Sequence, residues 1–491
     1  MAADASDGPF LAYHEPSIIS ILTLISFFLF LAVAEWLADK ALRASLIGHI
    51  VVGLVYGVPL GNILPGDWQE TFLALGYIGL LLIIFEGGLT IRLDLLKQNL
   101  VLSIIAALLG VLTPIALSFA LLYAGFHHGA LESFIVGVAL CSTSLGTTFI
   151  VLSGASKPSI PDAPAVEYAE TRVGTVLVSA AVLDDVCGLV LVSVIHNLRD
   201  IAADDHGGGG PGLGWIIGRP VMASVLMAVL TPVVAKFAAG PVYRRVGAPR
   251  AGYVVNVALM AVVLCASLAI AAYAGASVLF GAFLAGAFIS SLPGEGREGV
   301  GFVDTFDKYL GQIQKYVLVP LFFASIGFAI PFLDLWTGEV IWKGILYTLL
   351  MVLAKLVVGL VVPVWDFVAS RLRRTPGNSP RTLTASWAPA TLLGAAMVAR
   401  GEIGLLIIQI GLNETPFLSQ KAFVIGVWAI VLNTIIGPVL VGLLLKRVGP
   451  DIAGDPSWGV QAKQGSDTDG DGIAEPTGTS AGTSLAPALA C

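Results

Sequence analysis

Two neighbouring aspartates, Asp184 and Asp185, interrupt the apolar stretch "AAVLDDVCGLVLV". A charged side chain at the centre of a bilayer costs about 2.5–3.5 kcal/mol on insertion scales, so such residues face partners or water. Burial and a like charge nearby both favour the protonated form of a carboxylic acid. A carboxyl group in these surroundings can hold a proton or, when deprotonated, a small cation, but it cannot hold both well. Inside a membrane, this pair would have the chemistry that proton/cation exchange requires.

A lysine, Lys355, lies inside another apolar stretch, "LLMVLAKLVVGLVV". Adjacent helix positions point about 100° apart, so the two aspartates cannot face the same neighbour. We expect one aspartate to pair with Lys355 and the other to face a polar break in a neighbouring span. A purely structural ion pair would explain one aspartate and the lysine, but it would not explain the second acid.

A second charged cluster is predicted from Arg400, Glu402 and Glu86, which also lie at membrane depth in "ARGEIGLL" and "LLIIFEGGLTI". We expect Glu86 to be the partner of Arg400 in a structural role that braces two spans. The role of Glu402, two residues after Arg400 on another helix face, stays open.

Two long apolar stretches contain hydroxyl and glycine residues at mid-span: "LCSTSLGTTFI" and "APATLLGAAMVARGEIGLL". Such residues suit a helix that unwinds inside the membrane and offers backbone groups to an ion. Close packing of helices through small residues is the alternative explanation of the hydroxyl run. The combination of two interrupted spans with buried charges favours the broken helices.

These residues belong to a chain of 491 residues, of which 56% are hydrophobic and 12% charged. A soluble protein has about 25% charged residues, and stretches of about twenty apolar residues can cross a bilayer. The sequence therefore predicts an all-α, multi-pass membrane protein with thirteen transmembrane helices, at 17–38, 46–60, 71–90, 99–124, 131–153, 171–196, 214–238, 251–273, 276–291, 308–330, 340–368, 382–411 and 420–446.

The basic residues indicate the orientation of these spans. Of the 26 Lys and Arg residues, 20 fall in connections on one side and 4 on the other, with Lys355 and Arg400 inside spans. Basic loops stay in the cytosol. We expect residues 1–16 to be exterior or luminal and residues 447–491, rich in Gly, Ser, Thr and Asp, to form a disordered cytosolic tail. The protein would lie in the plasma membrane or an organelle membrane.

The two interrupted spans, the fifth and the twelfth, are seven spans apart. Spans two to six and nine to thirteen can therefore form two five-helix repeats, and the odd offset gives them opposite orientations in the membrane. Inverted repeats with two broken helices that cross near the midplane are typical of secondary transporters, and NhaA is an established example of this architecture.

The segments "VLDDVCGLV", "AKLVVG", "VPLFFASIGF", "FEGGL" and "ARGEIGLLI" resemble the monovalent cation:proton antiporter-2 family of the cation:proton antiporter superfamily. The double aspartate is most similar to the NhaA/NapA-like sodium/proton exchangers. The resemblance covers residues 17–446 and implies a homodimer with the NhaA-like antiporter fold. It implies a core of spans at about 99–196 and 340–446, which moves like an elevator against dimerisation and scaffold spans at about 17–90 and 214–330.

The resemblance also implies roles for individual residues. Asp184 matches the aspartate that pairs with a lysine, here Lys355. Asp185 matches the aspartate that binds the proton and the transported metal cation. Thr143 and Ser144 match the extended crossover of the first broken helix, and the charged motif after the second break matches Arg400 and Glu402.

The predicted function is exchange of a monovalent cation for protons by alternating access. Na⁺ is the expected ion and K⁺ or Li⁺ the alternative, and the resemblance to family members with an Asp-Asp pair implies electrogenic exchange. A sodium-coupled organic-anion symporter is the alternative outside this class. We expect no enzymatic activity, no cofactor and no nucleic-acid partner. We also expect no nucleotide-binding domain, because the tail lacks a glycine-rich strand–helix fingerprint.

Overall fold

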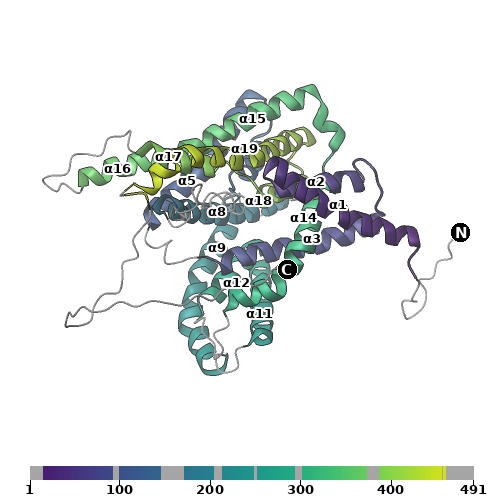
Figure 1. The fold of residues 1–491 in the computed structure, drawn as a ribbon, viewed down its shortest axis with the longest axis horizontal. Helices are drawn as coiled ribbons and strands as arrows, with labels where there is room; N and C mark the ends of the chain where they lie inside the picture. The colour runs from purple at the N-terminus through teal and green to yellow at the C-terminus, as the bar shows by residue number, and fades with distance from the viewer. Residues whose placement is uncertain are drawn as a thin grey trace, which may run out of the picture. The chain divides into compact units, whose positions relative to one another are not determined.

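The structure, a computed structural model, describes residues 15–91, 99–144, 168, 171–203, 213–247, 252–292, 301–372, 386–455 and 457–459 (Figure 1). Helices and their connections make up this part of the chain, apart from an isolated bridge residue at Thr171. The helices are α1 (Ile18–Leu42), α2 (Ser45–Tyr56), α3 (Gly66–Leu89), α5 (Leu100–Ser118), η1 (Phe119–Gly125), α6 (Ala130–Ala139), α8 (Arg172–Ala203), α9 (Leu213–Val234), η3 (Ala235–Ala239), α10 (Gly240–Val242), η4 (Tyr243–Gly247), α11 (Tyr253–Ala274), α12 (Val278–Ser290), α13 (Phe302–Phe306), η6 (Asp307–Gly311), η7 (Gln314–Leu318), α14 (Val319–Phe328), η8 (Phe332–Trp336), α15 (Gly338–Leu356), η9 (Val357–Leu360), α16 (Val361–Leu372), α17 (Trp387–Ala396), α18 (Glu402–Glu414) and α19 (Gln420–Ala453).

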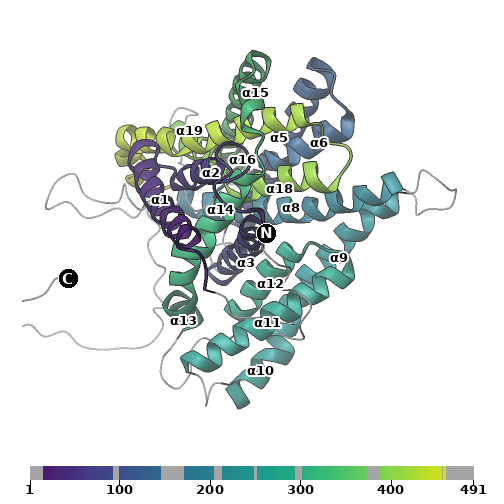
Figure 2. The ribbon, with the colours of Figure 1, turned by 90° about the vertical axis from the view of Figure 1, so that its right-hand side faces the viewer.

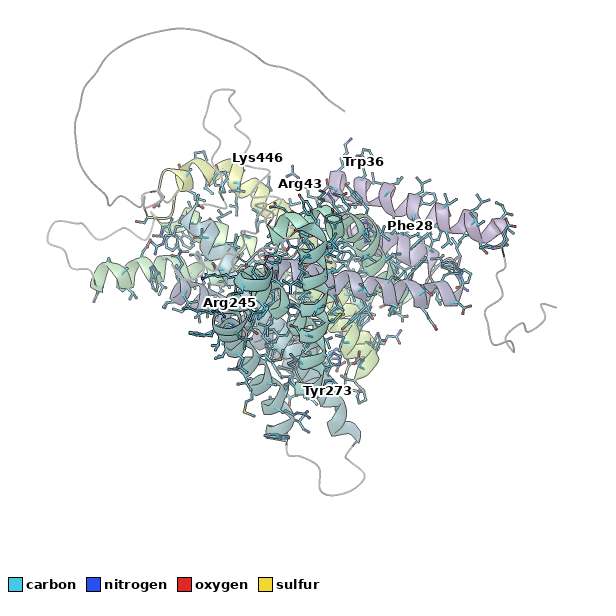
Figure 3. The ribbon with its side chains drawn as sticks, turned by 90° about the horizontal axis from the view of Figure 1, so that it is seen from below. Phe28, Trp36, Arg43, Arg245, Tyr273 and Lys446 are labelled. Atoms are coloured by element: carbon cyan, nitrogen blue, oxygen red, sulfur yellow. The ribbon has the colours of Figure 1, made fainter. Side chains whose placement is uncertain are left out.

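Eight helices in this part of the chain are long and apolar enough to cross a membrane, and four shorter apolar helices accompany them. A helix lies in each of the thirteen predicted ranges. Large apolar side chains stand out from several of these helices, and Figure 3 labels Phe28, Trp36 and Tyr273 among them. An outward-facing apolar surface suits contact with lipid, while thirteen crossings stay a prediction.

One group of packed helices consists of α1, α2, α3, α11, α12 and α14. Glycines let these helices approach until their backbones touch. A Cβ atom on Gly286 of α12 would lie 2.1 Å from the carbonyl oxygen of Phe85 in α3, a distance that no side chain allows. Small residues serve this purpose in membranes, where van der Waals packing replaces the hydrophobic effect as the force between helices.

The second group consists of α5, α6, α8, α15, α17, α18 and α19. Figure 1 shows most of these helices together, apart from α11 and α12. Helix α9 packs against α8 of this group and against α11 and α12 of the other, and Figure 2 shows it between them.

Both predicted helix breaks occur in the second group. Helix α6 ends at Ala139, and residues 142–144 have no regular secondary structure. Helix α17 ends at Ala396, and α18 begins only at Glu402. The two breaks meet, because the N–H of Ser144 donates to the carbonyl oxygen of Ala399 at 2.9 Å. The rest of the fifth predicted span, from residue 145 on, lies outside the described residues.

The prediction that the disordered tail begins at residue 447 is wrong. Residues 447–453 continue α19, and Trp458 is fully buried among apolar side chains that include Val173 and Val362. The apolar residues Ile452 and Trp458 supply the burial energy that a disordered segment lacks, although the surrounding composition is polar. Residues 460–491 lie outside the described part of the chain.

Candidate ion-binding site

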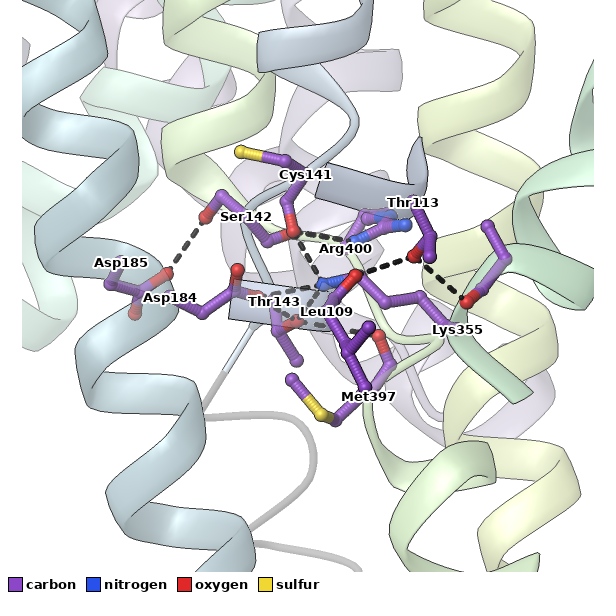
Figure 4. Close-up of polar contacts among 11 residues, drawn as sticks. Leu109, Thr113, Cys141, Ser142, Thr143, Asp184, Asp185, Lys355, Met397 and Arg400 are labelled. Carbon is purple, nitrogen blue, oxygen red and sulfur yellow. Dashed lines mark hydrogen bonds and ion pairs between the residues drawn. The ribbon is translucent and has the colours of Figure 1, made fainter. Parts of the chain in front are cut away.

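The middle of α8 lies beside both helix breaks and beside the end of α15. Figure 4 shows Asp184 and Asp185 on α8 pointing toward different residues of the first break. Asp184 is fully buried, whereas Asp185 keeps part of its surface exposed. The change of direction follows from the angle between successive helix positions.

Asp184 and Lys355 form an ion pair in which both side chains have 0% exposure, with 2.7 Å between Nζ and Oδ2. The ammonium group also donates to the carbonyl oxygen of Cys141 at 2.6 Å and to the Thr143 hydroxyl at 3.0 Å. An ammonium group has three N–H donors, so all three are used. The lysine charge is fully engaged inside the protein.

Thr143 completes the surroundings of this pair. Its hydroxyl donates to Oδ2 of Asp184 at 2.6 Å and lies 3.3 Å from the carbonyl oxygen of Met397 in the second break. The other carboxylate oxygen, Oδ1, is buried and has no hydrogen-bond partner among the described residues. A Cβ atom on Gly110 of α5 would lie 3.6 Å from this oxygen and 3.3 Å from Nζ of Lys355, so the glycine leaves room beside the pair.

Asp185 has a different environment. The hydroxyl of Ser142 donates to its Oδ1 at 2.8 Å. Within the described part of the chain, no basic side chain lies within ion-pair distance of Asp185, and the negative charges of Asp184 and Glu402 act on it more strongly than the positive charge of Lys355. The carboxylate of Asp185 therefore lacks the compensation that Lys355 gives to Asp184.

Arg400 forms hydrogen bonds to the backbone just after the end of α6. Its Nη1 donates to the carbonyl oxygens of Cys141, at 3.1 Å, and Ser142, at 2.8 Å. These carbonyls follow the C-terminus of α6, where a helix carries partial negative charge and cations are favourable. The Cys141 carbonyl accepts from Lys355 of α15 as well, so a cation from a helix and one from the second break meet on one backbone oxygen.

The predicted cluster of Arg400, Glu402 and Glu86 does not form. Glu86 of α3 accepts a hydrogen bond of 2.6 Å from Gln314 of η7, so its predicted pairing with Arg400 is wrong. Glu402 lies in the first turn of α18, where an acid interacts favourably with the helix dipole. Sequence position gives depth in the membrane but not the direction in which a helix faces, and this is why the pairing by charge failed.

The structure brings Thr143 and Ser144 to the crossing, as their place in the sequence implies. Ser144 bonds through its backbone to Ala399, and its side chain lies where a Cβ atom on Gly401 would be 2.8 Å away. Ser142, which bonds to Asp185, is the residue that the sequence reasoning did not single out. It belongs to the same hydroxyl run, but no spacing rule tells which hydroxyl of an unwound segment faces which aspartate.

Comparison with known proteins identifies the family to which the chain belongs. Residues 23–447 match the family described as "Sodium/hydrogen exchanger, transmembrane". The Na⁺/H⁺-K⁺ antiporter GerN of Bacillus cereus is 27% identical over 401 residues, which cover 81% of this chain and 88% of the relative. The Na⁺/H⁺ antiporter of Enterococcus hirae is 25% identical over 410 residues, covering 82% and 92%.

Among solved structures, the sodium proton antiporter MjNhaP1 of Methanocaldococcus jannaschii at pH 8 has a similar fold. The TM-score is 0.51 at 16% identity, and the match covers 88% of this chain and 99% of the other. With its apolar helices and the family match over most of its length, the chain is an integral, multi-pass membrane protein that belongs to the sodium/hydrogen exchanger family.

Proposed function

We propose that the protein exchanges Na⁺ for protons by alternating access, and that Asp185 holds the proton and the cation in turn. The observation that carries this proposal is the contrast between two adjacent carboxylates. Asp184 is neutralised by Lys355 at 2.7 Å, whereas the one side chain that bonds to Asp185 in the described part of the chain is the Ser142 hydroxyl, at 2.8 Å. A carboxylate without a counter-ion in a partly buried site gains from taking up either a proton or a metal cation.

The surrounding atoms suit a small hard cation. The Ser142 hydroxyl and the Asp185 carboxylate supply oxygen ligands, and they lie at the first helix break, where the backbone no longer bonds as a continuous helix and the Cys141 and Ser142 carbonyls accept from Arg400 instead. Carboxylate, carbonyl and hydroxyl oxygens are the donors that hard cations prefer. The names of the relatives from Bacillus cereus and Enterococcus hirae support Na⁺ and H⁺ as the exchanged ions.

Potassium is the second candidate ion, because the relative GerN is named as a Na⁺/H⁺-K⁺ antiporter. A sodium-coupled organic-anion symporter fits less well. Such a transporter needs no buried ammonium–carboxylate pair beside its cation site, and here Lys355 and Asp184 form one.

We propose further that the protein is a homodimer of the antiporter-2 type, with an NhaA-like arrangement of thirteen spans and electrogenic exchange. The second helix group would be the moving core and the first the scaffold, with the N-terminus exterior and the C-terminus cytosolic. The two groups pack mostly within themselves and are joined by α9 and by smaller contacts of α8 with α12 and of α14 with α18, which supports the division into core and scaffold.

Exchange in proteoliposomes tests the proposal. We expect wild-type protein to move protons when Na⁺ is added, and we expect Asp185→Asn to abolish this exchange because an amide cannot bind a proton or balance a cation. Glu86→Gln is the matched control, since this carboxylate lies away from the site and contacts Gln314. Comparison of Na⁺, Li⁺, K⁺ and Rb⁺ identifies the ion. Full activity of Asp185→Asn would reject Asp185 as the site.

A further inference from the structure

A buried tryptophan closes the end of the helix group that carries the site. Trp458 follows α19 and has 0% exposure. Its turn is fixed by Asp455, whose Oδ1 accepts from the backbone N–H groups of Ser457 at 2.8 Å and of Trp458 at 3.0 Å. Such a local bond orders a turn that its polar composition would otherwise leave loose.

The same turn caps the helix that carries the two aspartates. The N–H of Arg172, the first residue of α8, donates to the carbonyl oxygen of Gly459 at 3.0 Å, and that of Val173 donates to Trp458 at 3.3 Å. The first N–H groups of a helix have no partner within it. The chain after α19 supplies the partners for the first two of these groups, and the Thr171 hydroxyl accepts from the third, the N–H of Gly174.

The side chains extend this contact to α16. The indole N–H of Trp458 donates to both carboxylate oxygens of Asp366, at 3.0 and 3.2 Å, and the guanidinium of Arg172 lies 4.9 Å from the centre of the tryptophan ring. A cation at a helix N-terminus opposes the helix dipole, so the position of Arg172 depends on other contacts. These include the ring face, the Ser457 carbonyl and the side chain of Asn99, the residue before α5.

The positions of these contacts relate them to the ion site. Arg172 precedes Asp184 by 12 positions on α8, and Asp366 follows Lys355 by 11 positions along α15, η9 and α16. At 1.5 Å per residue, both separations are about 16–18 Å. Trp458 therefore joins the ends of the same two helical segments whose middles form the buried ion pair.

We infer that Trp458 is a positioning residue for cation binding: by holding Arg172 and Asp366 together, it fixes how α8 lies against the helix of Lys355. This inference rests on the proposed exchange of Na⁺ for protons. A proton needs one carboxylate oxygen, whereas a metal cation needs several oxygens held at fixed distances. If α8 is held less firmly against the helix of Lys355, cation binding therefore weakens more than proton binding.

The test compares Na⁺ dependence of exchange in full-length protein carrying Trp458→Ala or Trp458→Phe. Partners outside the ligand shell affect metal affinity about 10–100-fold in metal sites, and from this greater distance we expect Trp458→Ala to raise the KM for Na⁺ about fivefold. Turnover at saturating Na⁺ should stay within a factor of about two of wild type. Trp458→Phe keeps the ring face and loses the N–H, so its KM should lie in between.

Trp36→Ala is the control, because Trp36 is exposed and likewise carries a cation, Lys40, 5.0 Å from its ring centre. Its KM should equal that of wild type. If Trp458→Ala does not fold, Asp366→Ala breaks the same link from α16, together with the bond that Ser386 donates to this carboxylate, and should raise the KM in the same direction. A lower yield of active protein at unchanged KM, in either variant, would overturn the inference. Absence of Na⁺-driven proton movement in wild type would instead refute the proposed function.

Discussion

At the level of single residues, the carboxylates of Asp184 and Asp185 differ in the groups that balance their negative charge. Asp184 receives the Lys355 ammonium and the Thr143 hydroxyl, while Asp185 receives one hydroxyl from Ser142. The sequence alone predicted that the two aspartates face different neighbours. The assignment of Asp184 to Lys355 came from the family resemblance, because helix geometry separates the two side chains without saying which faces the lysine.

Removing one partner of this pair should cost more than removing both. We expect Asp184→Asn to lower the free energy of unfolding by about 3–5 kcal/mol, because it leaves a buried ammonium without a counter-ion. Adding Lys355→Met should restore most of that loss. Thermal unfolding of the detergent-solubilised variants measures both effects.

The double variant Asp184→Asn/Lys355→Met also tests electrogenic exchange. The double variant removes the carboxylate of Asp184 and the ammonium group of Lys355. Its site therefore has no lysine that supplies a further proton. We expect its exchange rate to lose the dependence on membrane voltage that wild type has. An identical response to voltage in both proteins would contradict a role of this pair in charge movement.

At the level of elements, the meeting of two broken helices depends on small residues. A Cβ atom on Gly401 would lie 2.8 Å from Cβ and Oγ of Ser144, and one on Gly437 would lie 2.5 Å from the backbone nitrogen of Ala399. Glycine and hydroxyl residues at mid-span allowed both breaks to be predicted. Which hydroxyl meets which aspartate could not be predicted, because an unwound segment has no fixed angular period.

Gly401→Ala should separate the two breaks. Overpacking of this kind costs about 1–3 kcal/mol, and it displaces the segment that carries Ser142 and Thr143. We expect lower stability together with an increased KM for Na⁺. Gly218→Ala is the control, since a Cβ atom there meets nothing within 4 Å and alanine favours the helix. Normal KM in Gly401→Ala would show that the crossing tolerates displacement.

At the level of the whole molecule, composition was enough to predict a multi-pass helical membrane protein. Composition gave a wrong prediction where a single buried residue orders a segment that is otherwise polar. The polar segment after residue 447 was predicted to be disordered, yet Trp458 is buried and bonded to Asp366. The error over Glu86 has a different origin, because depth in the membrane does not tell which way a helix faces, and the partner of Glu86 is Gln314 and not Arg400.

The predicted odd number of crossings puts the chain ends on opposite faces. In a variant whose other cysteines are replaced by alanine, we expect an impermeant thiol reagent to label Glu15→Cys from outside the membrane. Cys491 should react only after permeabilisation. The charge bias of the connections is the physical reason, because basic loops stay in the cytosol. Labelling of both positions from the same face would contradict thirteen spans.

The carbonyl oxygen shared by Lys355 and Arg400 belongs to the main chain of Cys141. Every amino acid supplies that oxygen, so a substitution of Cys141 that fits the space keeps the hydrogen bonds from both cations. Substitution at position 141 should therefore be limited by the volume and polarity of a fully buried side chain, and replacement of the cysteine by alanine should keep both bonds to this oxygen.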